Sequence, residues 1–181
     1  VEAVFSFNSK NFMADGSGGH SIRAIDKGFI LCQPGTEEKP WVEGSFCAMV
    51  DDEDTVVNYL WFRGDWFDAL TIAWKWIEEA QLVSNPPVTD ERPSPGASIY
   101  VPFKLEPGQE KTIKVMLSWY VPKSNVRIGV DPEPCCESTE STCCCCSEGE
   151  EKEEKKEVKE PDTYVPWYAT EFNSIEQVAA Y

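Results

Sequence analysis

The amino-acid sequence predicts a mainly β fold, a β-sandwich that carries one amphipathic helix and the start of a second helix at its C-terminal end. Two observations support this prediction. Several short segments have the apolar pattern of strands, and turn-rich connectors separate them. Only one internal stretch, residues 63–82, has helical spacing instead. With 181 residues, 41% of them hydrophobic and 12% aromatic, the chain is long enough for one domain with a substantial core.

The segments with strand pattern are, in chain order, residues 1–7, 28–32, 44–50, 56–62, 98–105 and 111–121. The first alternates between apolar and polar side chains, which predicts a strand with one buried face. The last two are the clearest, and the turn-forming EPGQE joins them. We expect the final strand to bury one face, formed by Ile113, Val115, Leu117, Trp119 and Val121.

The helical stretch places its apolar residues at i, i+4 and i+7, the spacing of one buried helix face. These residues are Trp66, Leu70, Ala73, Trp74 and Ile77. We expect Asp65 to be the N-cap of this helix, with Asp68 in the first turn. At the C-terminal end, Ser174 and Gln177 predict a capping box, and the apolar face that follows is cut off after about two turns. We interpret the chain as a fragment excised from a longer protein.

The formal net charge is −16, and half of it lies between residues 131 and 162, where twelve acidic residues face four lysines. This charge argues against binding to nucleic acid or to anionic membranes, and against an acidic substrate such as a phosphosugar. There is no apolar run of about 18 residues that would cross a membrane. Without a basic-then-apolar export signal or a glycosylation sequon, we expect a cytoplasmic protein, which would meet a membrane surface only through its parent chain. No cofactor is expected.

The stretch CCESTESTCCCC holds six of the eight cysteines. A metal site there would use Cys135, Cys136, Cys143, Cys144, Cys145 and Cys146. Structural zinc sites typically space their ligands as C-x(2–4)-C, whereas these cysteines come as one pair and one run of four. We therefore favour an acidic insertion whose cysteines are incidental, with a thiolate-rich metal site as the alternative. Cys32 and Cys47 lie on predicted strands and are interpreted as small buried apolar residues.

Two carboxylates, Asp65 and Asp68, stand among tryptophans, a combination that also suits sugar binding or glycoside hydrolysis. Helix capping and core packing explain the same residues more simply, and we favour that interpretation. The candidate substrate-binding residues are Trp61, Trp66 and Asp65.

Three segments together form a recognisable series: WFRGDWFDALTIAWKWIEEAQL, then YVPFKLEPGQEKTIKVMLSWYVP, then YVPWYATEFNSIEQVAAY. Their order and spacing resemble the N-terminal domain of glycoside hydrolase family 116, the non-lysosomal glucosylceramidase or bile-acid β-glucosidase family. The resemblance extends to VEAVFSFNSKNF at the start, so that it covers most of the chain apart from the cysteine-rich stretch.

The resemblance implies a β-sandwich that packs on a C-terminal (α/α)6 barrel, the two together forming a retaining β-glycosidase. Both catalytic carboxylates of the family belong to the barrel, so the resemblance assigns no catalytic residue to this chain. The chain departs from the family pattern in two ways. The first half of the N-terminal domain is missing, so some strands are expected to lack partners, and the cysteine-rich stretch is an enlarged insertion.

We therefore expect three parts: residues 1–130 as part of the N-terminal β-sandwich, residues 131–162 as the acidic insertion, and residues 163–181 as a linker and first helix toward a missing barrel. The expected partners are that barrel and, through the parent, a β-glucoside or glycolipid substrate. Two other classes of protein remain as alternatives. One is a carbohydrate-binding module with exposed tryptophans as its platform, and the other is a thiol-rich metal-binding protein.

Overall fold

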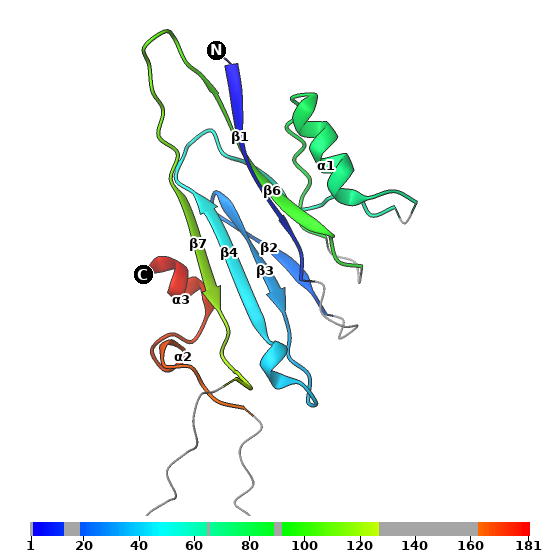
Figure 1. The fold of residues 1–181 in the computed structure, drawn as a ribbon, viewed down its shortest axis with the longest axis vertical. Helices are drawn as coiled ribbons and strands as arrows, with labels where there is room; N and C mark the ends of the chain where they lie inside the picture. Colours follow the sequence, from blue (N-terminus) through cyan, green and yellow to red (C-terminus); the bar gives the residue numbers. More distant parts are fainter. Residues whose placement is uncertain (1, 13–18, 65, 89–91, 127–162) are drawn as a thin grey trace, which may run out of the picture.

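The computed structural model describes residues 2–12, 19–64, 66–88, 92–126 and 163–181. Two antiparallel sheets lie face to face, which confirms the predicted β-sandwich (Figure 1). The three-stranded sheet has the order β1-β6-β5, with β1 at Glu2–Lys10, β6 at Gly96–Lys104 and β5 at Val56–Asn58. The four-stranded sheet has the order β2-β3-β4-β7, with β2 at Ser21–Ile25, β3 at Gly28–Gln33, β4 at Gly44–Val50 and β7 at Val115–Tyr120.

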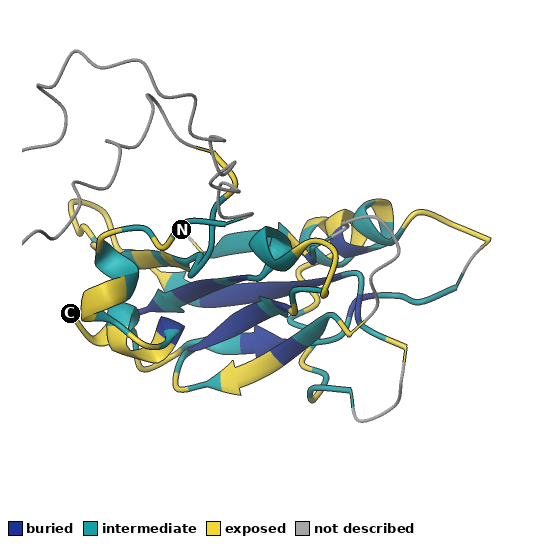
Figure 2. Ribbon diagram, turned by 90° about the horizontal axis from the view of Figure 1, so that it is seen from below, coloured by how far each residue is buried: buried dark blue, intermediate teal, exposed yellow. Residues whose placement is uncertain are grey.

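The core lies between the two sheets and follows from the alternation of the strands. In β1, Phe5 pairs with Val101 and Phe7 pairs with Ile99 of β6, so these four side chains share the inner face. The ring of Phe7 crosses to the opposite sheet, where its centroid lies 6.4 Å from that of Phe29 on β3. The buried strands of both sheets are dark in Figure 2, which views the sandwich along its layers.

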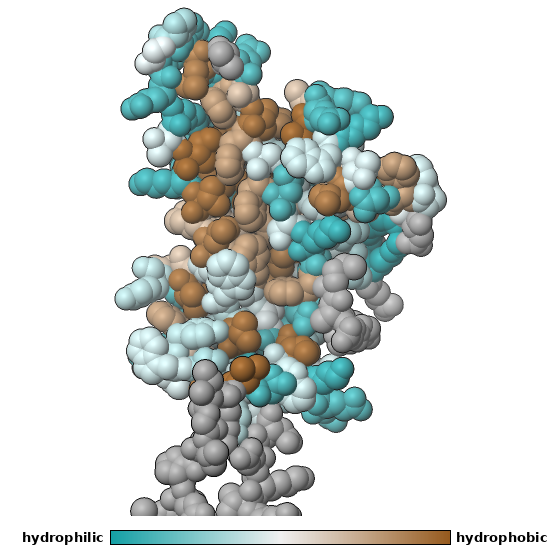
Figure 3. All heavy atoms as spheres, viewed as in Figure 1, coloured by the Kyte–Doolittle hydropathy of each residue, from teal (hydrophilic) through white to brown (hydrophobic). Residues whose placement is uncertain are grey.

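Strand β7 lies at the edge of the four-stranded sheet and is only partly covered. Ile113 and Val115 pack against the core as predicted. Leu117 and Trp119 share the inner face with Val115, yet they are 42% and 58% exposed. Among the described residues, β1 pairs only with β6, so the opposing sheet ends before it covers them. Figure 3 shows apolar side chains gathered along this side of the molecule.

Helix α1, at Ala69–Glu78, packs on the outer face of the three-stranded sheet through Ala73, which is buried (Figure 1). Its N-cap is Asp68, and the expectation that Asp65 caps the helix with Asp68 in the first turn was wrong. The carboxylate of Asp68 accepts hydrogen bonds from both the backbone N–H and the hydroxyl of Thr71, at 2.7 and 2.9 Å. A helix begins where such a cap is formed, so Trp66 precedes the helix and does not belong to its apolar face.

The C-terminal segment covers the outer face of the four-stranded sheet. It forms α2 at Tyr168–Glu171 and α3 at Ile175–Ala180. Ile175 is buried against Ile30 and Cys47. Ser174 caps α3 as predicted, since its Oγ accepts from the N–H of Gln177. The reciprocal hydrogen bond differs from that of a capping box, because the Gln177 side chain accepts from the N–H of Asn173, one residue before the cap. A short 3-10 helix, η1 at Pro40–Val42, precedes β4.

Two strands differ from the sequence-based prediction. Strand β2 was not predicted, because neither residue of its two-residue turn to β3 is a glycine. Lys27 adopts a positive φ of 52° in that turn, and Gly28 already belongs to β3. Strand β5 stops at Asn58 instead of continuing to residue 62. The side-chain oxygen of Asn58 accepts from the N–H of Leu60 and of Asn85, which turns the chain away from the sheet. In the described part of the chain, no helix is both long and apolar enough to cross a membrane.

Candidate functional site

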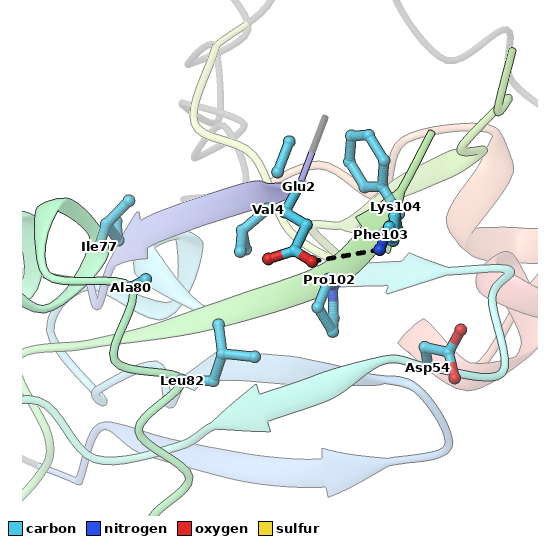
Figure 4. Close-up of a pocket in the computed structure, with 10 residues that line it drawn as sticks. Glu2, Val4, Asp54, Ile77, Ala80, Leu82, Pro102, Phe103 and Lys104 are labelled. Atoms are coloured by element: carbon cyan, nitrogen blue, oxygen red, sulfur yellow. Dashed lines mark ion pairs between the residues drawn. The ribbon is translucent and has the colours of Figure 1, made fainter. Parts of the chain in front are cut away.

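Two hollows lie where α1 meets the outer face of the three-stranded sheet. The larger has a volume of ≈ 660 Å³ and lies beside the C-terminal end of the helix. Its walls are mainly apolar and come from β1, β6, α1 and the segment after the helix (Figure 4). The residues that line it are Glu2, Ala3, Val4, Asp54, Ile77, Ala80, Leu82, Pro102, Phe103 and Lys104.

The charged groups of the larger hollow lie at its rim. Glu2 Oε1 and Lys104 Nζ form an ion pair at 3.6 Å, and both side chains are largely exposed. Figure 4 shows the carboxylate of Asp54 apart from this pair. An exposed ion pair contributes little binding energy, and the hollow does not bring two carboxylates together for acid–base chemistry. This arrangement can hold an apolar group, but it offers no means of hydrolysis.

The smaller hollow, of ≈ 290 Å³, lies under the middle of α1. It shares Ile77 with the larger one, and the two are lined by neighbouring outward-facing residues of β1. Its lining consists of Ser6, Asn8, Leu70, Ala73, Trp74 and Ile77. None of these side chains is charged. Polar groups come from the sheet, whereas the helix supplies apolar side chains and one indole.

A chain of hydrogen bonds runs through the sheet beneath the smaller hollow. The indole N–H of Trp61 donates to Ser98 Oγ at 2.8 Å. Ser98 in turn donates to Asn8 Oδ1 at 2.6 Å, and Asn8 Nδ2 donates to Ser6 Oγ at 2.6 Å. Because each group donates to the next, the side-chain amide of Asn8 and the hydroxyl of Ser6 are held in defined orientations.

Of the three residues predicted to bind substrate, the structure describes Trp61 and Trp66, which differ in their exposure. Trp61 is 2% exposed, so its indole offers no face to a ligand from solvent. It packs so closely on Gly96 that a Cβ at that glycine would lie 2.6 Å from the ring. Trp66 is 79% exposed and makes an edge contact with Phe62, with centroids 5.2 Å apart. Asp65 lies outside the described residues, and substrate binding by Trp66 stays a prediction.

Sequence reasoning did not select Ser6, Asn8 and Trp74. A signal for the first two was present, because β1 alternates and its polar positions form the face opposite the apolar core. Trp74 was assigned to the buried face of the helix, yet it lies at that face's edge and is 55% exposed. Only the position of the helix over the sheet brings these three residues to one hollow.

The cysteines of the proposed metal site, Cys135, Cys136, Cys143, Cys144, Cys145 and Cys146, lie outside the described residues. Among the residues that are described, no group of three or more His, Cys, Asp or Glu side chains could hold a metal ion. Cys47 is buried as expected, and burial, followed by the nearby charge of Glu176, raises the pKa of its thiol to about 11. Cys32 is only half-buried, and its sulfur accepts a hydrogen bond from Arg23.

The family of the chain follows from a comparison with known protein families. Residues 4–181 match the family described as beta-glucosidase 2, glycosyl-hydrolase family 116 N-term. No curated protein and no solved structure matches the chain at a significant level. Because the family match spans nearly the whole chain, the protein belongs to glycoside hydrolase family 116, whose N-terminal region it represents.

Proposed function

We propose that this chain is a non-catalytic β-sandwich portion of a β-glucosidase, whose role is to support a catalytic (α/α)6 barrel elsewhere in the parent protein. The observation that carries this proposal is the match of residues 4–181 to the N-terminal region of glycoside hydrolase family 116. The barrel, not the sandwich, would then hydrolyse β-glycosides with retention of configuration.

The distribution of carboxylates supports a non-catalytic role. Retaining glycosidases need two carboxyl groups about 5 Å apart in a cleft. In the larger hollow, Glu2 pairs with Lys104 and Asp54 stands apart, while the smaller hollow is lined by no acidic residue. Neither hollow of the described structure therefore has the pair of groups that the reaction requires.

The exposed apolar surface supports packing against another part of the parent. Leu117 and Trp119 on β7 lie beside the edge of β1 that has no partner among the described residues. Near the C-terminal helices, Val165 and Trp167 are also exposed. Single exposed apolar side chains are common, but a large continuous apolar patch is rare on a monomeric protein, so the pair on β7 fits a contact that the complete protein would cover.

Specificity for glucosylceramide or a related glycolipid, and a cytoplasmic location, belong to the same proposal. The chain's own features that accord with them are its strong negative charge, which opposes acidic substrates, and the mainly apolar walls of the larger hollow. The sugar and aglycone would be selected by the barrel.

The proposal is tested by comparing the chain alone with its full-length parent in hydrolysis of p-nitrophenyl β-D-glucopyranoside. We expect turnover by the parent and none by the chain alone. In the parent, Trp119→Asp should lower the thermal stability and the activity together, because it places a charge in the proposed contact with the barrel. Asp54→Asn, at the rim of the larger hollow, is the control and should leave the rate unchanged. Hydrolysis by the chain alone, or a parent without glycosidase activity, would overturn the proposal.

A further inference from the structure

We propose that the smaller hollow, between α1 and the outer face of β1, binds one ring of a neutral sugar. Ser6 and Asn8 would hydrogen-bond its hydroxyl groups, and Trp74 would stack on its C–H face. This binding function goes beyond support of a catalytic barrel and does not depend on it. The inference rests on the hydrogen-bonding capacity, the charge and the size of the hollow, and on the position of the indole.

Hydrogen-bonding capacity remains at the sheet side of the hollow. A side-chain amide carries two N–H donors and an oxygen with two lone pairs. The hydrogen bonds found among the described residues use one donor and one lone pair of Asn8, to Ser6 and from Ser98. Ser6 accepts from Asn8, which leaves its own O–H to donate. A hydroxyl group both donates and accepts, so a polyol matches this mixed set of groups better than an ion does.

The same face of the sheet carries two further polar groups that find no partner in the described protein. Tyr100, which stands opposite Ser6 in the register of β1 and β6, has a buried hydroxyl without a hydrogen bond. On β5, Asn58 Nδ2 is likewise buried and unpaired. Buried polar groups are nearly always paired in folded proteins, so this face has more hydrogen-bonding capacity than folding alone uses.

The lining contains no charged side chain, although the chain as a whole carries a net charge of −16. A cationic ligand would therefore find no carboxylate in the hollow to pair with it. An anionic ligand would meet no cation there and would also be opposed by the protein's overall field. The hollow consequently selects for a neutral ligand.

Trp74 provides the aromatic surface that sugar rings need, since their C–H faces are apolar while their edges are polar. It is 55% exposed and lines the hollow together with Leu70 and Ala73 from the same helix. A tryptophan contributes large contact area at a low entropic cost, because it has only two side-chain torsions. The volume of ≈ 290 Å³ is near the lower end of ligand cavities and corresponds to one ring with its hydration.

The test is a titration of the complete chain with cellobiose and with methyl β-D-glucopyranoside, followed by calorimetry and by tryptophan fluorescence. We expect saturable binding with a Kd on the order of 1 mM, a range typical of a single small contact area. The methyl glycoside of glucuronic acid should bind at least about tenfold more weakly, because its carboxylate would have no partner in the hollow.

Three variants separate a specific site from non-specific contact. Trp74→Ala should weaken cellobiose binding by about tenfold or more, and Ser6→Ala by a smaller factor. Trp167→Ala is the matched control, since Trp167 is also largely exposed but belongs to the C-terminal segment on the other sheet. Thermal unfolding checks that each variant is folded, and Trp74→Tyr, which keeps an aromatic face, should restore most of the binding.

The inference is overturned if the wild-type chain binds neither sugar saturably. It is equally overturned if folded Trp74→Ala and Ser6→Ala variants both bind cellobiose as tightly as the wild type. Neither result would bear on the parent's hydrolytic activity, so a failure of this site is distinguishable from a failure of the proposed function.

Discussion

Ser124 and Tyr164 form an isolated antiparallel bridge, in which the N–H of each residue donates to the carbonyl of the other at 2.8 and 2.7 Å. The six clustered cysteines and much of the acidic charge lie between them in the sequence. The bridge extends the connection beyond β7 and is followed by the hydroxyl of Tyr168, which hydrogen-bonds the backbone of Val121. The chain therefore leaves the sandwich and re-enters it at one place, with both sides fixed.

This bridge predicts that residues 127–162 can be replaced by a short glycine-serine linker without loss of the fold. Each halving of the number of residues that join two fixed points lowers the entropic cost of closing the loop by about 0.6 kcal/mol. Urea unfolding of the shortened chain would measure the gain in the free energy of unfolding, which we expect to be about 0.6 to 1.2 kcal/mol for one to two halvings. A marked loss of stability would contradict the interpretation of this stretch as an insertion.

The six clustered cysteines are predicted not to form a specific metal site. In a zinc titration of the reduced chain we expect no saturable stoichiometric step, because the cysteines do not follow the spacing of structural zinc ligands. The variant with all six replaced by serine is the control and should have the same unfolding curve in zinc as the wild type. A defined zinc stoichiometry that stabilises the wild type alone would favour the thiol-metal alternative.

Trp61 is predicted to be a structural residue. Trp61→Ala should lower the free energy of unfolding by about 3–5 kcal/mol, since it leaves a cavity and removes the hydrogen bond to Ser98. Trp61→Phe should lose less, on the order of 1–3 kcal/mol, mostly for the unpaired polar groups. Trp66→Ala, at an exposed position, should stay within about 0.5 kcal/mol of the wild type in the same urea experiment.

The cap of α1 should make the stability of the chain depend on pH. Hydrogen bonds from the backbone and side chain of Thr71 hold the pKa of Asp68 below its ordinary value. The folded state therefore favours the ionised carboxylate of Asp68. The stability that this carboxylate contributes is fully present above the pKa of an unfolded aspartate, and it is lost as pH falls through the lowered pKa of the folded state. Asp68→Asn, which can still cap the helix, should weaken this acid dependence in thermal melts, whereas Asp68→Ala should also lower stability at neutral pH.

Cys47 should titrate and react only when the fold opens. Burial raises the pKa of its thiol from 9.0 to about 11, so the folded state favours the neutral thiol. Its contribution to stability is complete below pH 9 and is lost as pH rises toward 11. In the chain with residues 127–162 replaced, Ellman's reagent should modify Cys32 first and Cys47 only in denaturant. Rapid modification of both in the native state would contradict the buried position.

The sandwich was predictable from the sequence because strand alternation records which side of a sheet is buried. Phe5 and Phe7 on one face of β1, and Val115 on β7, were identified correctly for this reason. The cap of α1 was not, because Asp65 and Asp68 both precede an apolar stretch and only the hydrogen bonds to Thr71 decide between them. Strand β2 was missed because Asp26 and Lys27 form its turn, and the nearest glycine, Gly28, is already part of β3.

The candidate site was harder to predict than the fold. Ser6 and Trp74 are far apart in the sequence, and neither belongs to a recognisable motif. Their meeting depends on how α1 crosses the sheet, which is decided by packing of Ala73 and its neighbours and not by local pattern. The exposure of individual tryptophans was equally hard to predict from the sequence. Trp61 and Trp66 both lie in the same tryptophan-rich stretch, yet the first is buried and the second is exposed.

The edge of β1, which has no partner strand in the part of the chain that the structure describes, has a practical consequence for anyone who produces this chain by itself. A long strand edge that no described strand pairs with, next to the partly exposed side chains of Leu117 and Trp119, is a template on which other chains can add strands. Concentrated samples of the isolated chain should therefore aggregate through added strands. Phe5→Lys would not prevent this, because the side chain of Phe5 packs against the core and its replacement leaves the backbone groups of the edge in place. Co-expression with the neighbouring parts of the parent is the more direct way to keep it monodisperse.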